Sequence, residues 1–598
     1  MANFDGAANA REAETFIQAF HRMAEAVPER LALRTSDGAM EVRWGEVRQR
    51  ADAIAGGLEK LGVAHGETVA LMLGNRPEFH IADLAVMTAG ATPFSIYQTL
   101  PPESIEYVVG DADARVAIIE RAFYEPFMKA RQNLPKLEHV ILIDGEGEQG
   151  TIGLSEIEGS NPGFDVEASV ARVTPEHLIT LIYTSGTTGP PKGVQLTHAN
   201  LIAAVRILNQ VIEVPDEARV ISWLPTAHIA ERAANYYIPL AFGASITTLD
   251  DPRNIIQVLP DVRPSFFFAV PRIWEKMKAG IEAQLEQLPE ENRDLAKKAI
   301  AAGVQRVRLE QAGQEVPEAL ASVCARADEE LFSKLRALLG LQDAMAINTG
   351  AAPTPVDVLE FFHAIGLELA EVWGMSETTG AGTTNPPGRV RIGTVGPPAP
   401  EIEVKLDTDG EVLIRGPILM QGYRNLPDKT AETFTEDGWL RTGDIGEFDE
   451  HGYLSIVDRK KELIINAAGK NMSPANIESK LKGASPFIGQ ACTIGDARPY
   501  NTALIVLDAD YVPAWAEQNE IAETSLDALA ENEKVVAAVE EGVAAANEQL
   551  SRVEQIKKFH IVRGDWLPGG DELTPTMKLK RKPIAEKYAR EIEALYAK

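Results

Sequence analysis

The stretch from Tyr183 to Val194, with the sequence YTSGTTGPPKGV, constrains this chain more than any other. It follows the apolar run HLITLIY, which predicts a buried strand, and it precedes a helix-like segment over 199–211. Glycines let a backbone turn tightly and direct several N–H groups at one point. Threonine and serine hydroxyls add donors, and Lys192 adds a mobile positive charge. We therefore predict a loop that binds a polyphosphate.

A P-loop and a flexible surface loop are two alternative interpretations of this segment. A P-loop requires the spacing G-x-x-x-x-G-K-[ST], which is missing here because Lys192 follows Pro191. A flexible surface loop would also be rich in glycine and proline. It would not need three threonines, a serine and a lysine between a strand and a helix. The composition favours phosphate binding.

The bulk properties exclude several classes of protein. A chain of 598 residues is too long for one core, so two or more domains are expected. A net charge of -30 disfavours nucleic acids and anionic membranes as partners. The cysteines, Cys324 and Cys492, are far apart and suggest neither a disulfide framework nor a zinc site.

The chain shows no secretory signal and no run of about 18 apolar residues. We expect a cytoplasmic protein without an integral membrane segment, although contact with a membrane surface stays open. The oligomeric state cannot be predicted from the sequence.

Apolar periodicity predicts alternating strands and helices in the first part of the chain. Such alternation indicates βαβ units and a mainly parallel sheet. The expected elements are a helix over 44–61, a strand over 68–73, a helix over 77–89 and strands over 91–96, 116–120 and 140–144.

The later parts of the chain differ in composition and in their pattern of apolar residues. Residues 275–340, rich in Ala, Glu, Leu, Gln and Arg, predict a helical insertion. Residues 400–458 alternate short strands with glycine turns, which predicts a small antiparallel β subdomain. The expected fold class is α/β. A large N-terminal domain, residues 1–458, has parallel-rich sheets with helices and that subdomain, and a smaller, mobile α+β domain spans 459–598.

The sequence GEGEQG from Gly145 to Gly150 matches the dinucleotide pattern G-x-G-x-x-G. That fingerprint needs a helix to begin there, so that its N-terminus faces the pyrophosphate. Thr151, Gly153 and Pro162 follow instead, and two glutamates would repel phosphate. We interpret this segment as an acidic surface turn, and we set a nicotinamide oxidoreductase aside.

Three further segments are candidates for a site. His228, in the sequence PTAHIAER, is a candidate active-site group, although a lone histidine is more often structural. Gly350-Ala-Ala-Pro353 would let a flat ring lie against the backbone, or would simply end a strand. Trp373, followed by GMSETTG, could stack on a base while its glutamate holds a cation.

These segments, in this order, resemble the adenylate-forming superfamily, which includes acyl-CoA synthetases, peptide-synthetase adenylation domains and luciferases. The resemblance covers nearly the whole chain. It is carried by YTSGTTGPPKGV (183–194), GAAP (350–353), WGMSE (373–377), WLRTGD (439–444), DRKKELI (458–464), GKNMSP (469–474) and LTPTMK (573–578).

Within that superfamily the chain is similar to long-chain acyl-CoA synthetases of bacteria and plants. That similarity rests on LPTAHIAER (224–232), PRIWEK (271–276), the helical insertion and GKN (469–471). The resemblance implies that ATP activates a long-chain fatty acid to acyl-AMP, with Mg²⁺, and that the acyl group passes to CoA.

The resemblance also implies roles for individual residues. Glu377 and Thr184 would bind Mg²⁺, and Lys578 would bridge the substrate carboxylate and the α-phosphate. His228 would lie where the acyl chain and the CoA tunnel meet. The phosphates would be held by Thr184, Ser185, Gly186, Thr187, Thr188, Gly189 and Lys192. Adenine and ribose would contact Gly350, Ala351, Ala352, Trp373, Gly374, Met375, Ser376, Asp444 and Arg459.

For the second step, the resemblance implies rotation of the small domain about a hinge near Lys461. Gly469 and Lys470 would then line the pantetheine tunnel. The alternative for Lys461 is a solvated surface charge. Ala468 replaces a frequent glycine and puts the tunnel geometry in doubt, and Ile465 stands where luciferases carry a lysine.

Three rival functions were kept. The first is a ligase that loads a carrier protein, and the second is a CoA ligase for another hydrophobic acid. The third, a catalytically inactive relative, is disfavoured because the charged residues that the family needs are present. The acyl chain length is not predicted.

Overall fold

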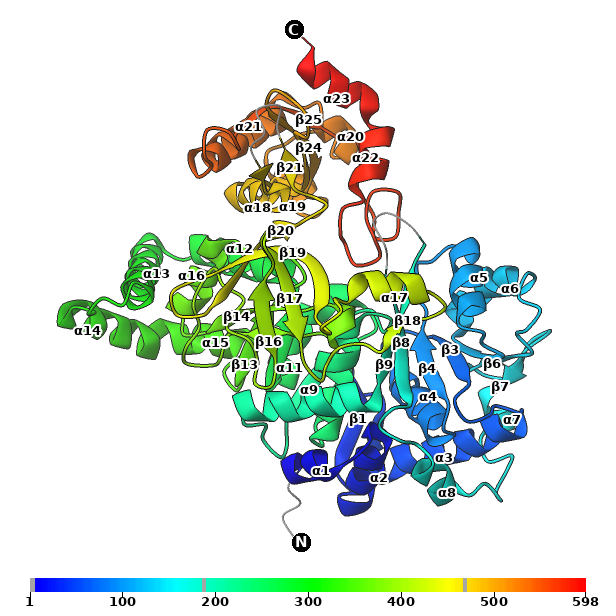
Figure 1. Cartoon of the computed structure of the whole chain (residues 1–598). Helices are drawn as coiled ribbons and strands as arrows, with labels where there is room; N and C mark the ends of the chain where they lie inside the picture. The colour runs from blue at the N-terminus through cyan, green and yellow to red at the C-terminus, as the bar shows by residue number, and fades with distance from the viewer. Residues whose placement is uncertain (1–5, 185–189, 466–470, 598) are drawn as a thin grey trace.

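The computed structural model describes residues 6–184, 190–465 and 471–597. Figure 1 shows a large lower part, and the C-terminal part, coloured orange to red, lies above it. The N-terminus is at the opposite end of the large part.

Within the described residues, the largest sheet has eight strands, and all of them except β18 come from residues 68–197. Its central strands are apolar and fully buried on both faces, as parallel strands covered by helices require. The strands β7, β6, β5, β3, β4 and β8 run parallel, whereas β9 and β18 add antiparallel pairs at one edge. In order across the sheet they are β18 (Gly422–Tyr423), β9 (Lys192–Thr197), β8 (Leu178–Thr184), β4 (Thr92–Ser95), β3 (Thr68–Met72), β5 (Val116–Ile119), β6 (His139–Leu142) and β7 (Ile152–Gly153).

Two further sheets complete the α/β part. One contains β10 (Arg219–Ser222), β11 (Ser245–Thr248), β1 (Leu31–Thr35) and β2 (Glu41–Arg43). The other contains β12 (Phe266–Ala269), β13 (Ala346–Thr349), β14 (Leu369–Trp373) and β15 (Thr383–Thr384). The helices that pack on these sheets include α2 (Phe16–Ala26), α3 (Trp44–Lys60), α4 (Pro77–Thr88), α5 (Pro102–Asp111), α9 (His198–Val211), α11 (Ile255–Val262) and α16 (Val356–Ala364).

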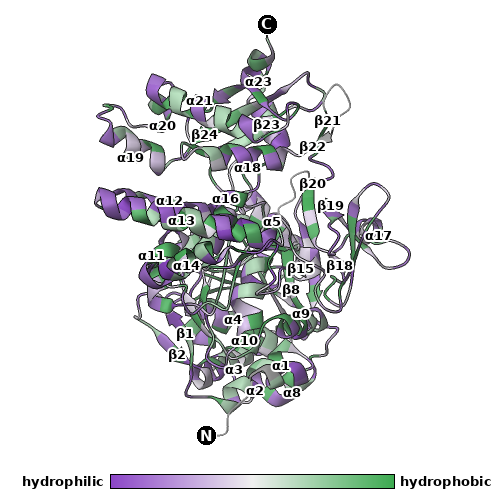
Figure 2. Cartoon of the chain, turned by 90° about the vertical axis from the view of Figure 1, so that its left-hand side faces the viewer, coloured by the Kyte–Doolittle hydropathy of each residue, from purple (hydrophilic) through white to green (hydrophobic). Residues whose placement is uncertain are grey.

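The helical insertion is present where it was predicted. Prolines begin or separate its helices, since proline lacks an N–H and fits a first turn but not a helix interior. In Figure 2 the ribbon of the first two of these helices carries many residues coloured as hydrophilic. They are α12 (Pro271–Glu286), α13 (Glu290–Gln311), α14 (Glu318–Ala327) and α15 (Ser333–Leu338).

The antiparallel subdomain is also confirmed. Its strand order is β16 (Glu403–Leu406), β17 (Glu411–Arg415), β19 (Leu440–Phe448) and β20 (Leu454–Arg459), all paired antiparallel. Gly410 and Gly452 lie in the turns with positive φ, a conformation that costs glycine little.

The C-terminal part has its own small core. Its main sheet contains β23 (Ile488–Ile494), β24 (Asn501–Leu507) and β25 (Ile556–Ile561). The short pair β21 (Ile464–Ile465) and β22 (Asn471–Met472) precedes it. Its helices include α18 (Pro474–Ala484), α19 (Tyr511–Gln518), α21 (Glu533–Glu548), α22 (Arg581–Lys587) and α23 (Ala589–Tyr596).

The sequence prediction missed one element beside the glycine-rich loop. We expected a strand, a loop and then a helix, but β9 intervenes and pairs antiparallel with β8. Thr184 lies opposite Lys192 in that pair, so the loop connects the two strands of a hairpin. The acidic segment at 145–150 is an exposed turn, as predicted.

Candidate active site

The predicted site residues gather at the carboxyl ends of strands. β8 ends at Thr184, β13 at Thr349 and β14 at Trp373. Ligands of open α/β sheets bind at this edge. Residues from the antiparallel subdomain and the C-terminal part reach the same region, as the contacts below show.

Asp444 and Trp373 are joined by a hydrogen bond. The indole Nε1 donates to Asp444 Oδ2 at 2.8 Å, and Arg459 Nε lies 2.7 Å from Asp444 Oδ1. Asp444 is nearly buried, and this burial raises the pKa of its carboxyl group, while Arg459 and Trp373 oppose the shift. These contacts give a carboxylate held in one orientation beside a large aromatic ring.

Glu377 lies on the other side of this region, in a short helix, η5 (Ser376–Thr378). Its Oε1 accepts a hydrogen bond of 2.6 Å from the hydroxyl of Tyr423. The Lys192 ammonium lies 3.9 Å from the centre of the Tyr423 ring. Burial lowers the pKa of Lys192, and the negative charge of Glu377 opposes that change.

The backbone around Trp373 and Gly350 is tight. A Cβ atom on Gly374 would lie 2.3 Å from the carbonyl oxygen of Gly380, so a side chain does not fit there. A Cβ on Gly350 would lie 3.0 Å from the carbonyl oxygen of Val372. Ala351 has φ of +70°, which is unusual for a residue other than glycine, and it is exposed. An exposed, strained turn beside a strand end is typical of a binding site.

His228 lies in a turn before a π-helix, η2 (Glu231–Tyr237). Its Nδ1 accepts a hydrogen bond from the N–H of Ala230 at 3.2 Å, which assigns the ring proton to Nε2. Burial, together with the positive charge of Lys578, lowers the pKa of His228 to about 3. The ring is therefore neutral at pH 7 and can donate through Nε2.

The turn that carries His228 is anchored by a buried ion pair. Arg232 Nε donates to the carbonyl oxygen of Thr226 at 3.1 Å, and Arg232 Nη1 lies 2.8 Å from Asp83 Oδ1. Both charged side chains are completely buried. Glu231 accepts hydrogen bonds from the N–H groups just before the same turn. These contacts hold the turn that carries His228 in place.

Lys578 reaches the site from the C-terminal part. It follows a tight turn in which its N–H donates to Thr574 Oγ1 at 3.0 Å, and Met577 has φ of +63°. Burial lowers the pKa of Lys578 and Arg459 adds to the effect, whereas Asp444 and Glu377 oppose it. The Lys578 side chain still contacts solvent. Water therefore reduces the effect of desolvation on its pKa.

Most of the predicted site residues that the structure describes come together. Lys461 occupies an exposed turn between β20 and β21. Ser185, Gly186, Thr187, Thr188, Gly189, Gly469 and Lys470 lie outside the described residues.

The sequence prediction missed Tyr423, Asp83 and the anchoring role of Arg232. Tyr423 has no motif of its own, and β18, which contains it, is formed by pairing with distant β9. Asp83 gives no local signal either, because its partner is 149 residues away.

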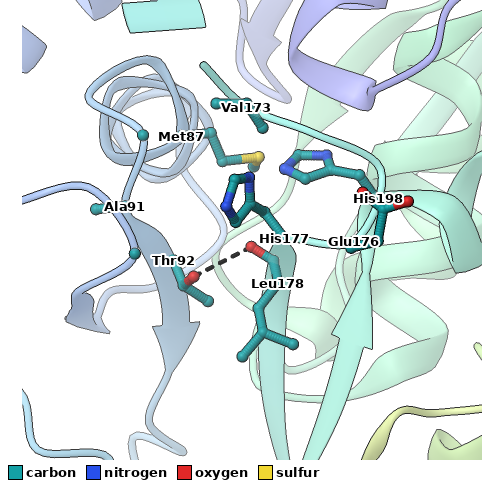
Figure 3. Close-up of a pocket in the computed structure, with 10 residues that line it drawn as sticks. Met87, Ala91, Thr92, Val173, Glu176, His177, Leu178 and His198 are labelled. Atoms are coloured by element: carbon teal, nitrogen blue, oxygen red, sulfur yellow. Dashed lines mark hydrogen bonds between the residues drawn. The ribbon is translucent and has the colours of Figure 1, made fainter.

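A separate cavity of about 150 Å³ lies away from this site (Figure 3). It is found where β4 and β8 begin, and Thr92 Oγ1 donates to the Leu178 carbonyl oxygen at 3.1 Å. His177 and His198 line it. No group of three or more metal-ligating side chains occurs among the described residues. The carboxyl-end site remains the candidate.

In the part of the chain that the structure describes, no helix is long and apolar enough to cross a bilayer. The comparisons with known proteins agree with the architecture. The family model of AMP-binding enzymes matches residues 20–424, and that of the AMP-binding enzyme C-terminal domain matches 461–598.

Two curated relatives illustrate the similarity. A Mycobacterium tuberculosis protein assigned as fatty-acid–CoA ligase fadD11 is 48% identical over 451 residues, covering 75% of this chain and 79% of that protein. The long-chain-fatty-acid–CoA ligase FadD15 of Mycobacterium bovis is 36% identical over 573 residues, covering 94% of both.

A solved anthranilate CoA ligase, AuaEII in complex with anthranoyl-AMP, has the same fold. Its TM-score is 0.72, with 21% identity over 97% of this chain and 98% of that one. The chain belongs to the AMP-binding enzymes, the adenylate-forming superfamily, and within it to the fatty-acid–CoA ligases.

Proposed function

We propose that the protein converts a long-chain fatty acid, ATP and CoA into acyl-CoA, AMP and pyrophosphate. In the first step a carboxylate oxygen attacks the α-phosphorus, and the bond to pyrophosphate breaks. In the second, the CoA sulfur attacks the acyl carbon after its proton leaves, and AMP departs. The names of the relatives support both the acid and the acceptor.

The observation that carries this proposal is that Lys578 lies within electrostatic range of Asp444, Glu377 and His228. These carboxylates belong to the large part of the chain, whereas Lys578 belongs to the C-terminal part. Attack of an anion on a triphosphate concentrates negative charge, and a fixed cation stabilises that charge most in the transition state. We infer that Lys578 supplies this cation.

On the nucleotide side, Trp373 would stack on adenine and Asp444 would accept hydrogen bonds from the ribose hydroxyls. Arg459 holds Asp444 from the other side. The strained turn at 350–352 and the residues Gly374, Met375 and Ser376 would form the rest of the adenine pocket.

On the phosphate side, Lys192 and the hydroxyl of Thr184 would contact the phosphates. Glu377 and Thr184 would hold Mg²⁺, because hard cations prefer carboxylate and hydroxyl oxygens. The hydroxyl of Tyr423 donates to Glu377 Oε1, and Glu377 Oε2 would contact the ion. Bound there, Mg²⁺ would neutralise phosphate charge.

For the second step we propose that residues 459–598 rotate about Lys461 relative to residues 1–458. Lys578 would then leave the site, and CoA would enter beside His228 and the 469–470 segment. The neutral His228 can donate through Nε2 to the acyl carbonyl or carboxylate oxygen. We place the reaction in the cytoplasm, since a net charge of -30 favours a dissolved protein.

Pyrophosphate release with ATP, Mg²⁺ and acids from acetate to oleate tests this proposal. We expect long-chain acids to drive release, and CoA to be needed for sustained turnover. Release that stalls at bound acyl-AMP despite CoA would favour a ligase that loads a carrier protein. Preference for a shorter or aromatic acid would refute the long-chain assignment.

A further inference from the structure

Tyr423 occupies a fixed position between two oppositely charged side chains. It lies in β18, where it is opposite Val194 of β9, and its N–H donates to Thr430 Oγ1 at 2.9 Å. The side chain is almost completely buried. The ring therefore has little freedom to move.

The two ends of the Tyr423 side chain contact different partners. Its hydroxyl donates to Glu377 Oε1 at 2.6 Å, and the face of its ring lies 3.9 Å from the Lys192 ammonium. In the described part of the chain, Lys192 forms no ion pair with a carboxylate. The negative charge of Glu377 nevertheless acts on Lys192.

Glu377 and Tyr423 are also coupled through the backbone. The carbonyl oxygen of Glu377 accepts a hydrogen bond from the N–H of Met420 at 2.8 Å, three residues before the tyrosine. Thr379 Oγ1 donates to the carbonyl oxygen of Ile418 at 2.7 Å. These two hydrogen bonds connect the short helix that carries Glu377 to the segment that leads into the strand with Tyr423.

We propose that Tyr423 is a positioning residue that separates Lys192 from Glu377 and keeps both available for MgATP. This inference rests on the proposed function, in which Lys192 contacts phosphate and Glu377 contacts the metal.

The physical reason is the strength of a partly buried ion pair. Without a spacer, a mobile lysine beside a carboxylate closes on it, and each charge then neutralises the other. The ring face holds the ammonium by a weaker cation–π attraction, which a polyphosphate readily replaces. The hydroxyl occupies one oxygen of Glu377 and leaves the other oxygen for the metal.

The test measures binding of a non-hydrolysable ATP analogue by calorimetry, in Mg²⁺ and in EDTA. Tyr423→Phe keeps the ring and removes the hydroxyl. We expect it to lose about tenfold to a hundredfold of the affinity gained from Mg²⁺, the usual effect of one hydrogen bond to a charged group, and to keep its affinity in EDTA. Retention of the full Mg²⁺ gain would overturn the proposal.

Tyr423→Leu removes the spacer altogether. We expect its affinity to fall about tenfold in EDTA as well, because Lys192 then pairs with Glu377. Adding Glu377→Gln to Tyr423→Leu frees the lysine and restores binding in EDTA, which a merely structural role would not do. Failure of this rescue would refute the spacer.

Tyr453→Phe is the matched control, because that hydroxyl donates to the Arg389 carbonyl oxygen, and Tyr453 is not among the proposed site residues. Wild-type binding with Mg²⁺ tests the proposed function separately. Binding that Mg²⁺ strengthens, with Tyr423→Phe equal to Tyr453→Phe, would refute only the role of Tyr423.

Discussion

The two sides of the candidate site are built differently. Asp444, Glu377 and Tyr423 are nearly buried, and each is held by hydrogen bonds within the large part of the chain. Lys578 is exposed, and its N–H and its carbonyl oxygen both form hydrogen bonds with Thr574. The three buried residues thus belong to the core of the large part, whereas Lys578 belongs to the C-terminal part.

The contacts between these units include two ion pairs. Lys276 Nζ lies 2.6 Å from Asp510 Oδ2, and Arg272 pairs with Asp508 beside it. An exposed ion pair such as that of Lys276 with Asp510 is worth about 0–1 kcal/mol. A two-step reaction can use this difference, because the nucleotide stays on the rigid side while the lysine is exchanged for the thiol.

Lys578→Ala should have the largest effect. We expect formation of acyl-AMP to fall at least about a thousandfold, since a preorganised charge in the transition state is lost. Conversion of supplied acyl-AMP to acyl-CoA should stay within a few-fold of wild type. Lys582→Ala, on an exposed side chain nearby, is the control. Equal loss of both half-reactions would remove the contrast between the two sides.

Lys461→Pro should separate the two steps in the opposite direction. Proline restricts φ, so rotation about this turn is hindered. We expect the thioester step to slow by about a hundredfold, the scale on which a gating motion can limit turnover, while adenylation is retained. Lys461→Ala removes the charge and leaves the backbone free, so it should resemble wild type. Unchanged turnover in Lys461→Pro would argue against a hinge here.

Lys276→Ala should have the smallest effect. Loss of its ion pair with Asp510 should slow adenylation by less than about fivefold, and high salt should remove the difference. Asp510→Asn should give the same change, and the double variant no more. A loss above about tenfold would show that the interface is more than a weak polar contact.

Local patterns predicted much of the fold. Buried apolar runs such as 68–73 became strands, and alternating strands with glycine turns became the antiparallel subdomain. The breaks in the helical insertion followed its prolines. Each of these features depends on residues close together in sequence.

Two strands of the largest sheet were not predicted. The strand β9 pairs with its neighbour β8, but it lies directly before a helix, so nothing nearby distinguished it from the loop. The two-residue strand with Tyr423 exists because β9 is its neighbour. The contacts within the site arise in the same way, so motifs identified the residues but not Tyr423 between them.

The buried pair of Arg232 and Asp83 has a consequence for protein engineering. Replacing either partner leaves the other charge buried and unpaired. This lowers the free energy of unfolding by about 3–5 kcal/mol, a large share of the stability of a domain. Attempts to alter acid preference by substitutions beneath the His228 turn will therefore give unfolded protein before they give new specificity. Mutant libraries should leave this pair unchanged and vary other side chains around the His228 turn.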